Sequence, residues 1–101
     1  NQKFEIDVIL IKGYQLVGVS CTTDSTKGLC KSKGFEIFLR TRQIGGEEAR
    51  AVLVTRLKSS VRDELQDELE VDTGGKENIL ILGEEDLKGD ILKTKFKEFI
   101  S

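Results

Sequence analysis

The fold class of this chain is decided by residues 4–21, which read Phe-Glu-Ile-Asp-Val-Ile-Leu-Ile-Lys-Gly-Tyr-Gln-Leu-Val-Gly-Val-Ser-Cys. Residues 4–11 begin with apolar and acidic residues in alternation and end as a wholly apolar run, which is typical of a strand with one buried end. Lys12 and Gly13 supply a tight turn, and residues 14–21 are again rich in apolar and β-branched residues. The stretch therefore predicts an antiparallel β-hairpin.

A helix is predicted next, over residues 31–43, and Gly45 and Gly46 stop it. Its expected apolar face contains Phe35, Phe38, Leu39 and Arg42. Residues 49–55 can be interpreted in two ways, as the middle of one long helix that reaches Glu70 or as a short buried strand. The β-branched run and the preceding glycine pair favour the strand.

The second half of the chain repeats the alternation of helix and strand. Ser59 or Ser60 is expected to cap a helix, and residues 79–82 are apolar throughout, as a central parallel strand should be. A final helix is expected to begin at the acidic residues 84–86, at its positive end. Its predicted buried face consists of Leu87, Ile91, Leu92, Phe96 and Phe99. The order predicts an α/β fold, a mixed sheet with an antiparallel hairpin followed by αβαβα units, with helices on its faces.

The bulk composition limits the function classes. A chain of 101 residues is one domain, and its net charge of −2 gives no general basic field, so nucleic-acid binding requires a local patch. No apolar run is long enough to cross a membrane, so no membrane partner is expected. The chain starts at Asn1 and contains no Met, which we interpret as the C-terminal part of a larger protein.

Two cysteines, Cys21 and Cys30, are too few for a disulfide framework. We expect both to be reduced, buried and structural, with a disulfide across the short loop between them as the alternative. Reduced cysteines are typical of a cytoplasmic protein.

One acid, Asp7, is embedded in the first predicted strand, and Glu5 points to the same face because strand side chains repeat every two residues. Carboxylates on a strand can hold the divalent cation, Mg²⁺ or Mn²⁺, that phosphodiester hydrolysis uses. The alternative for Asp7 is a solvent-facing residue on an edge strand.

Basic residues gather around the first predicted helix. They are Lys27, Lys31, Lys33, Arg40 and Arg42. This cluster can hold the phosphate backbone of a nucleic acid, or it is an ordinary solvated helix face. The residues themselves do not decide between these interpretations.

The predicted hairpin resembles the core of the PD-(D/E)XK nuclease superfamily, and most of all the nuclease domain attached to CARF sensor domains in CRISPR-associated effectors. In that family a strand of the type Asn-Glu-Ile-Asp-Val precedes a strand that ends in an acid and, two residues later, a lysine. Residues 5–11 and 19–23 are similar to these two strands. The resemblance extends more weakly over residues 35–46, 52–55 and 82–87. It implies a restriction-endonuclease-like fold.

Carried over residue by residue, the resemblance makes Asp7 the metal-binding acid. Ser20 stands where the second acid is usual, and Thr22 stands where the catalytic lysine is usual. Lys27 and Lys31, just downstream, are candidates to replace that lysine, and the alternative is that both are solvated surface lysines.

The resemblance implies a metal-dependent nuclease in antiviral defence. By the same resemblance, the protein is expected to cut DNA or RNA as a homodimer and to be regulated by an upstream sensor domain of the same chain. The alternative is a catalytically inactive nuclease-fold module with a structural, dimerisation or interaction role.

Overall fold

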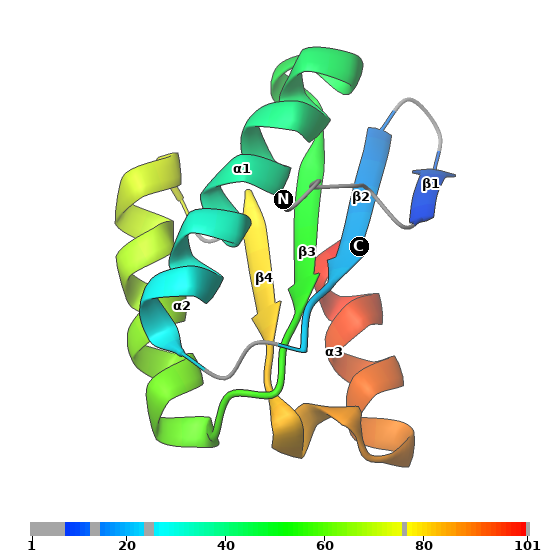
Figure 1. The fold of residues 1–101 in the computed structure, drawn as a ribbon. Coiled ribbons are helices and arrows are strands. Elements are labelled where there is room, and N and C mark those ends of the chain that lie inside the picture. The colour runs from blue at the N-terminus through cyan, green and yellow to red at the C-terminus, as the bar shows by residue number, and fades with distance from the viewer. Residues whose placement is uncertain (1–7, 13–14, 24–25, 76, 101) are drawn as a thin grey trace.

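The fold is a small α/β sandwich, seen in a computed structural model that describes residues 8–12, 15–23, 26–75 and 77–100. Figure 1 shows the helices and strands in chain order. They are β1 Val8–Lys12, β2 Gln15–Cys21, α1 Lys27–Gly45, a 3₁₀ turn at Gly46–Glu48, β3 Arg50–Val54, α2 Ser59–Thr73, β4 Ile79–Leu82, a 3₁₀ turn at Glu84–Leu87 and α3 Gly89–Ile100.

The four strands form one sheet in the order β1-β2-β3-β4. β2, β3 and β4 are parallel to one another, and β1 runs antiparallel to β2, with Val8 opposite Val19. Residues 13–14, which connect β1 to β2, lie outside the described residues. The predicted α/β class is confirmed, and so is the strand at residues 50–54, because β3 pairs with β2 along its whole length.

Helices cover both faces of the sheet. α1 and α2 lie on one face and α3 lies on the other, as Figure 1 shows. The larger apolar cluster joins α1 and α2 to the sheet through buried residues such as Ile37, Leu53 and Leu65. The smaller cluster, under α3, contains Val17, Val52 and Leu82. Such a three-layer arrangement explains why β3 and β4 are apolar on both faces.

α1 differs from its prediction in extent and in the face that it buries. It begins at Lys27, not at Lys31, and Phe35 and Leu39 are exposed. Its buried residues are Cys30, Gly34, Ile37, Phe38 and Thr41. Several of these are small or polar, so a search for large apolar residues at helical spacing selects the wrong face.

Small residues let α1 approach the sheet closely. A Cβ atom added to Gly18 in β2 would lie 2.5 Å from the Thr41 hydroxyl oxygen. One added to Gly34 would lie 2.8 Å from a methyl group of Leu69 in α2. The absence of a side chain at Gly18 allows α1 to lie this close to β2, and the absence of one at Gly34 leaves room for the end of the Leu69 side chain.

Residues 79–82 are buried except for Leu80, as predicted, but the prediction that they form a central strand is wrong. β4 lies at the edge of the sheet, and Leu80 is only half-buried. The strand is nevertheless wholly apolar in sequence, because α2 covers one of its faces and α3 covers part of the other. Side chains of α2 also bond to the backbone along its outer edge.

The last helix also begins later than predicted. Residues 84–87 form a separate 3₁₀ turn, and α3 starts at Gly89, whose φ is +42°. This break changes the helical phase, so Leu87 and Ile91 are exposed, contrary to prediction. Leu92, Phe96 and Phe99 do pack against the sheet, as predicted.

Candidate functional site

The carboxyl ends of β2, β3 and β4 meet at one edge of the sheet, where ligand sites of parallel sheets commonly form. Backbone hydrogen bonds fix the segments that leave the strands there. The Thr22 N–H donates to the Val54 carbonyl at 2.8 Å, and the Thr55 N–H donates to the Leu82 carbonyl at 2.8 Å. The end of β2, which carries two of the predicted site residues, is therefore held in a defined position.

Ser20 lies inside the protein. Its exposed fraction is only 4%. Val17 and Val19 contact the α3-side cluster, and strand side chains alternate between faces, so Ser20 and Thr22 are directed toward α1. A buried hydroxyl on this face accepts hydrogen bonds but carries no negative charge.

The side chain of Lys33 ends beside Thr22, the residue that stands where the resemblance expects a lysine. Its ammonium nitrogen, extended from α1, donates a hydrogen bond to the Thr22 hydroxyl oxygen at 3.2 Å. Lys33 is partly buried there. The structure thus brings Thr22 together with Lys33, a residue that the sequence analysis placed in the nucleic-acid-binding cluster.

Lys27 and Lys31 are directed elsewhere, toward acids on α2. Lys27 lies 2.5 Å from Glu68 and 3.2 Å from Glu64, and Lys31 lies 3.0 Å from Glu68 and 3.7 Å from Asp72. Hydrogen bonds with Glu68 raise the pKa of both lysines, and the same bonds lower the pKa of Glu68. Their charges are compensated on this side of α1.

The carboxylate side of the predicted site lies outside the described residues, because Glu5 and Asp7 precede Val8. Within the described part of the chain, no three acidic, His or Cys side chains are grouped to hold a metal ion. The hydroxyls of Ser20 and Thr22 alone do not fit a divalent cation, which prefers carboxylate oxygens. A metal site here therefore depends on Glu5 and Asp7.

Two cations that the sequence analysis did not single out lie at the same edge of the sheet. Arg56 and Lys58 follow β3 directly, and both are exposed. Their position in the sequence could have identified them, because residues that directly follow a buried parallel strand lie at the carboxyl edge of the sheet.

Cys21 and Cys30 do not form a disulfide. Cys30 is buried, as predicted, but the prediction that Cys21 is buried is wrong, because Cys21 lies exposed at the end of β2.

Comparison with models of known protein families finds no match for this chain, and comparison with curated proteins finds none. Among the described residues, no helix combines the length and the apolar composition that crossing a bilayer requires.

Proposed function

We propose that this chain is a restriction-endonuclease-like domain that cleaves DNA or RNA with a divalent metal ion, and that Lys33 replaces the lysine missing at Thr22. The observation that carries the proposal is the 3.2 Å hydrogen bond from the Lys33 ammonium to the Thr22 hydroxyl. It puts a positive charge at the end of β2 although the sequence position there is neutral.

Each residue has a distinct role in this proposal. Asp7 and Glu5 would hold the metal ion, which when bound polarises the phosphoryl group and acidifies water. The Lys33 ammonium donates a hydrogen bond to the attacking water or to a phosphate oxygen, and the Thr22 hydroxyl keeps the flexible lysine aimed at that place.

The test is cleavage of labelled DNA and RNA oligonucleotides with Mg²⁺ or Mn²⁺. Lys33→Ala should reduce the rate by about 100-fold or more, and Asp7→Ala should abolish it. Lys31→Ala is the matched control, because it removes the same charge from the same helix but from the α2 side. Equal losses in Lys33→Ala and Lys31→Ala would contradict the role of Lys33.

A second candidate function, an inactive module with a structural or dimerisation role, is favoured by the nearly complete burial of Ser20 as a neutral hydroxyl. It predicts that the unmodified protein cleaves nothing with either metal. In that case Ser20→Glu combined with Thr22→Lys should create activity if the fold descends from a nuclease. The antiviral setting, the upstream sensor domain and the homodimer are part of the same proposal and rest on the family resemblance.

A further inference from the structure

A cavity of about 540 Å³ opens at the carboxyl edge of the parallel strands. Its walls come from the segments that follow β2, β3 and β4, and it begins one residue beyond Thr22. The lining residues are Thr23, Arg56, Leu57, Lys58, Val61 and Glu84.

The cavity carries two cations, Arg56 and Lys58, and one acid, Glu84. Among the described residues, none forms an ion pair or a side-chain hydrogen bond with Arg56 or Lys58. Other cations of the protein are engaged: Arg62 bonds to the Ile81 carbonyl at 2.6 Å, and Lys95 pairs with Asp86 at 2.6 Å. Since most of the protein's basic side chains have partners within the fold, two that have none and that share a cavity are suited to bind an external anion.

The backbone that presents these cations is rigid. The Leu57 carbonyl, between them in sequence, accepts a hydrogen bond from the Glu84 N–H at 2.7 Å. The Leu57 N–H donates to the Thr55 hydroxyl, which itself donates to the Leu82 carbonyl at 2.8 Å. A Cβ atom at Gly83 would lie 2.6 Å from the Leu57 carbonyl oxygen, so the two loops are in direct contact. Rigid presentation reduces the entropy lost when the cations bind a ligand.

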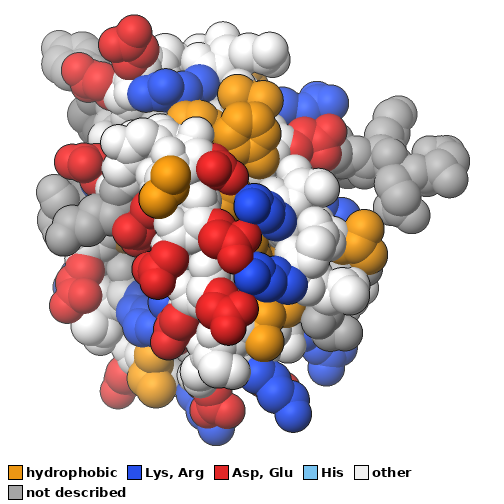
Figure 2. Space-filling model, turned by 90° about the vertical axis from the view of Figure 1, so that its left-hand side faces the viewer, with side chains coloured by type: hydrophobic (Ala, Val, Ile, Leu, Met, Phe, Trp, Pro, Cys, Tyr) orange, Lys and Arg blue, Asp and Glu red, His pale blue; other side chains and the backbone are white. Residues whose placement is uncertain are grey.

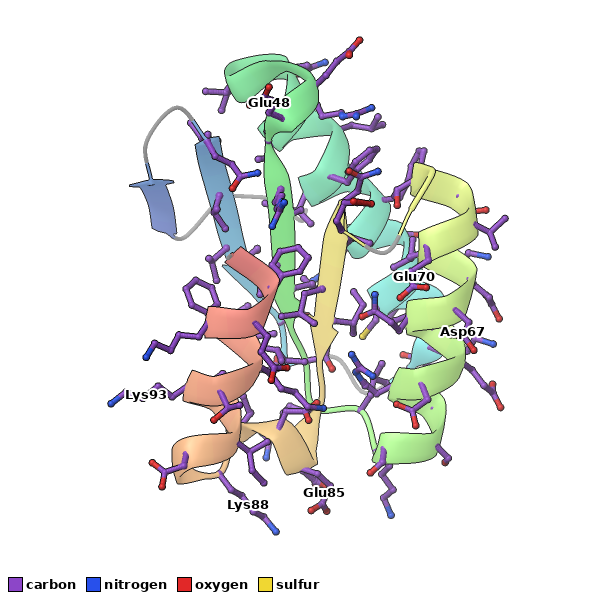
Figure 3. All side chains as sticks on the ribbon, turned by 180° about the vertical axis from the view of Figure 1, so that it is seen from behind. Glu48, Asp67, Glu70, Glu85, Lys88 and Lys93 are labelled. Atoms are coloured by element: carbon purple, nitrogen blue, oxygen red, sulfur yellow. The ribbon has the colours of Figure 1, made fainter. Side chains whose placement is uncertain are left out.

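The rest of the surface restricts where an anion can bind. Figure 2 shows red acidic side chains crowded over the face of α2. Several of these, including Asp63, Asp67 and Glu70, are carried by α2, and Figure 3 shows Asp67 and Glu70 projecting from that helix. The acidic face of α2 is therefore less suited to a polyanion than the cavity that carries Arg56 and Lys58.

We propose that this cavity holds the phosphate backbone of a nucleic-acid strand, with Arg56 and Lys58 as the positioning residues that bind its phosphates. The inference rests on the proposed nuclease function and deepens it. A strand bound at Arg56 and Lys58 passes Thr23 and therefore leads to Thr22 and Lys33. The negative charge of Glu84 on the cavity wall disfavours binding of a compact, multiply charged anion such as pyrophosphate. Phosphates spaced along a nucleic-acid strand can contact Arg56 and Lys58 at a greater distance from Glu84.

The experiment measures binding separately from cleavage. A fluorescent single-stranded oligonucleotide is titrated with the protein in EDTA, at several salt concentrations, and its anisotropy is recorded. Each of Arg56→Ala and Lys58→Ala should weaken binding and reduce the slope of log K against log salt by about 0.7, the value for one phosphate contact on a single strand. Glu84→Gln should tighten binding.

Lys93→Ala is the matched control, because Lys93 is exposed on α3 and points away from the sheet in Figure 3. Equal effects of Lys93→Ala and Arg56→Ala would overturn the inference, as would displacement of the oligonucleotide by equimolar pyrophosphate. If Arg56 and Lys58 govern binding but no metal supports cleavage, the inference stands and the nuclease function fails. If cleavage occurs while both variants bind normally, the nuclease function stands and the inference fails.

Discussion

The side-chain amide oxygen of Gln66 accepts a hydrogen bond from the backbone N–H of Ile81 at 2.7 Å. Gln66 lies where the next strand of the sheet would otherwise be. The same amide donates to the Ile79 carbonyl at 2.9 Å. A residue in a parallel strand bonds in this way to two residues of its neighbour that are two positions apart. Gln66 therefore imitates a peptide group, and a helix supplies the hydrogen bonds that the edge of the sheet lacks.

Removing this amide should destabilise the protein. Gln66→Leu keeps a side chain of similar size but leaves the Ile81 N–H and the Ile79 carbonyl without their partner. Each unsatisfied buried group costs about 1–3 kcal/mol, and we expect a loss of about 2 kcal/mol or more in the free energy of unfolding. Urea denaturation measures it. Gln43→Leu, at an exposed position of α1, is the control and should change stability by less than about 0.5 kcal/mol.

The close contact between Gly18 and Thr41 predicts a coupled pair of substitutions. Gly18→Ala places a methyl group 2.5 Å from the Thr41 hydroxyl and should cost about 1–3 kcal/mol through overpacking. Thr41→Ala removes the colliding atoms, so the double variant should be more stable than the sum of the two single effects implies. Strict additivity in thermal or urea unfolding would show that α1 does not pack against Gly18 in this way.

Charge substitutions in β4 should have unequal effects. Ile81 is wholly buried, so Ile81→Asp puts an unpaired charge into the core and should prevent stable folding. Leu80 is half-buried beside an open cleft, so Leu80→Asp should leave a folded protein with reduced stability. Circular dichroism during thermal unfolding distinguishes the two. A Leu80→Asp variant as unfolded as Ile81→Asp would restore the view of β4 as a central strand.

Asp86 should make stability fall in acid. Burial alone would raise the pKa of its carboxyl, but hydrogen bonds from the Gly83 N–H and from Lys95, with the charge of Arg62, lower it below the ordinary value of about 3.8. The folded state then binds its proton less readily than the unfolded state. The stabilisation is present above about pH 3.8 and is lost as pH falls through the lower folded value.

The measurement is the urea midpoint of the wild type and of Asp86→Asn from about pH 6 down to about pH 3. At neutral pH the variant should be less stable by about 1–3 kcal/mol, and the difference should shrink in acid. A difference that stays constant with pH would mean that the Asp86 charge does not contribute. Glu68 is present in both proteins, so its own lowered pKa cancels in the comparison.

The order of helices and strands could be predicted because glycines and small polar residues separate the apolar segments, although the large apolar residues of α1 did not mark its buried face. The position of β4 at the edge of the sheet could not be predicted. An edge strand is apolar on both faces when helices cover both, and the polar side chains that bond to its edge belong to α2. The late start of α3 depends on the Asp86 side chain bonding to the Gly83 N–H and on the positive φ of Gly89. Neither is visible in a hydrophobic pattern.

The candidate site shows a similar division. Thr22 could be identified from the resemblance, but the candidates for its partner were Lys27 and Lys31. At about 100° per residue, Lys31 lies almost above Lys27, whereas Lys33 lies on another side of the helix. Only the packing of α1 decides which side faces the end of β2, and that packing depends on the small residues Gly18 and Gly34.

Gln66 and Arg62 bond to the backbone of β4 along its outer edge, so the groups that a further strand would use there already have partners. Strand-by-strand growth of an aggregate needs two open ends on every copy. The β4 edge of this domain is therefore not a template for a further strand, and edge-to-edge growth cannot proceed through it without breaking the bonds of Gln66 and Arg62.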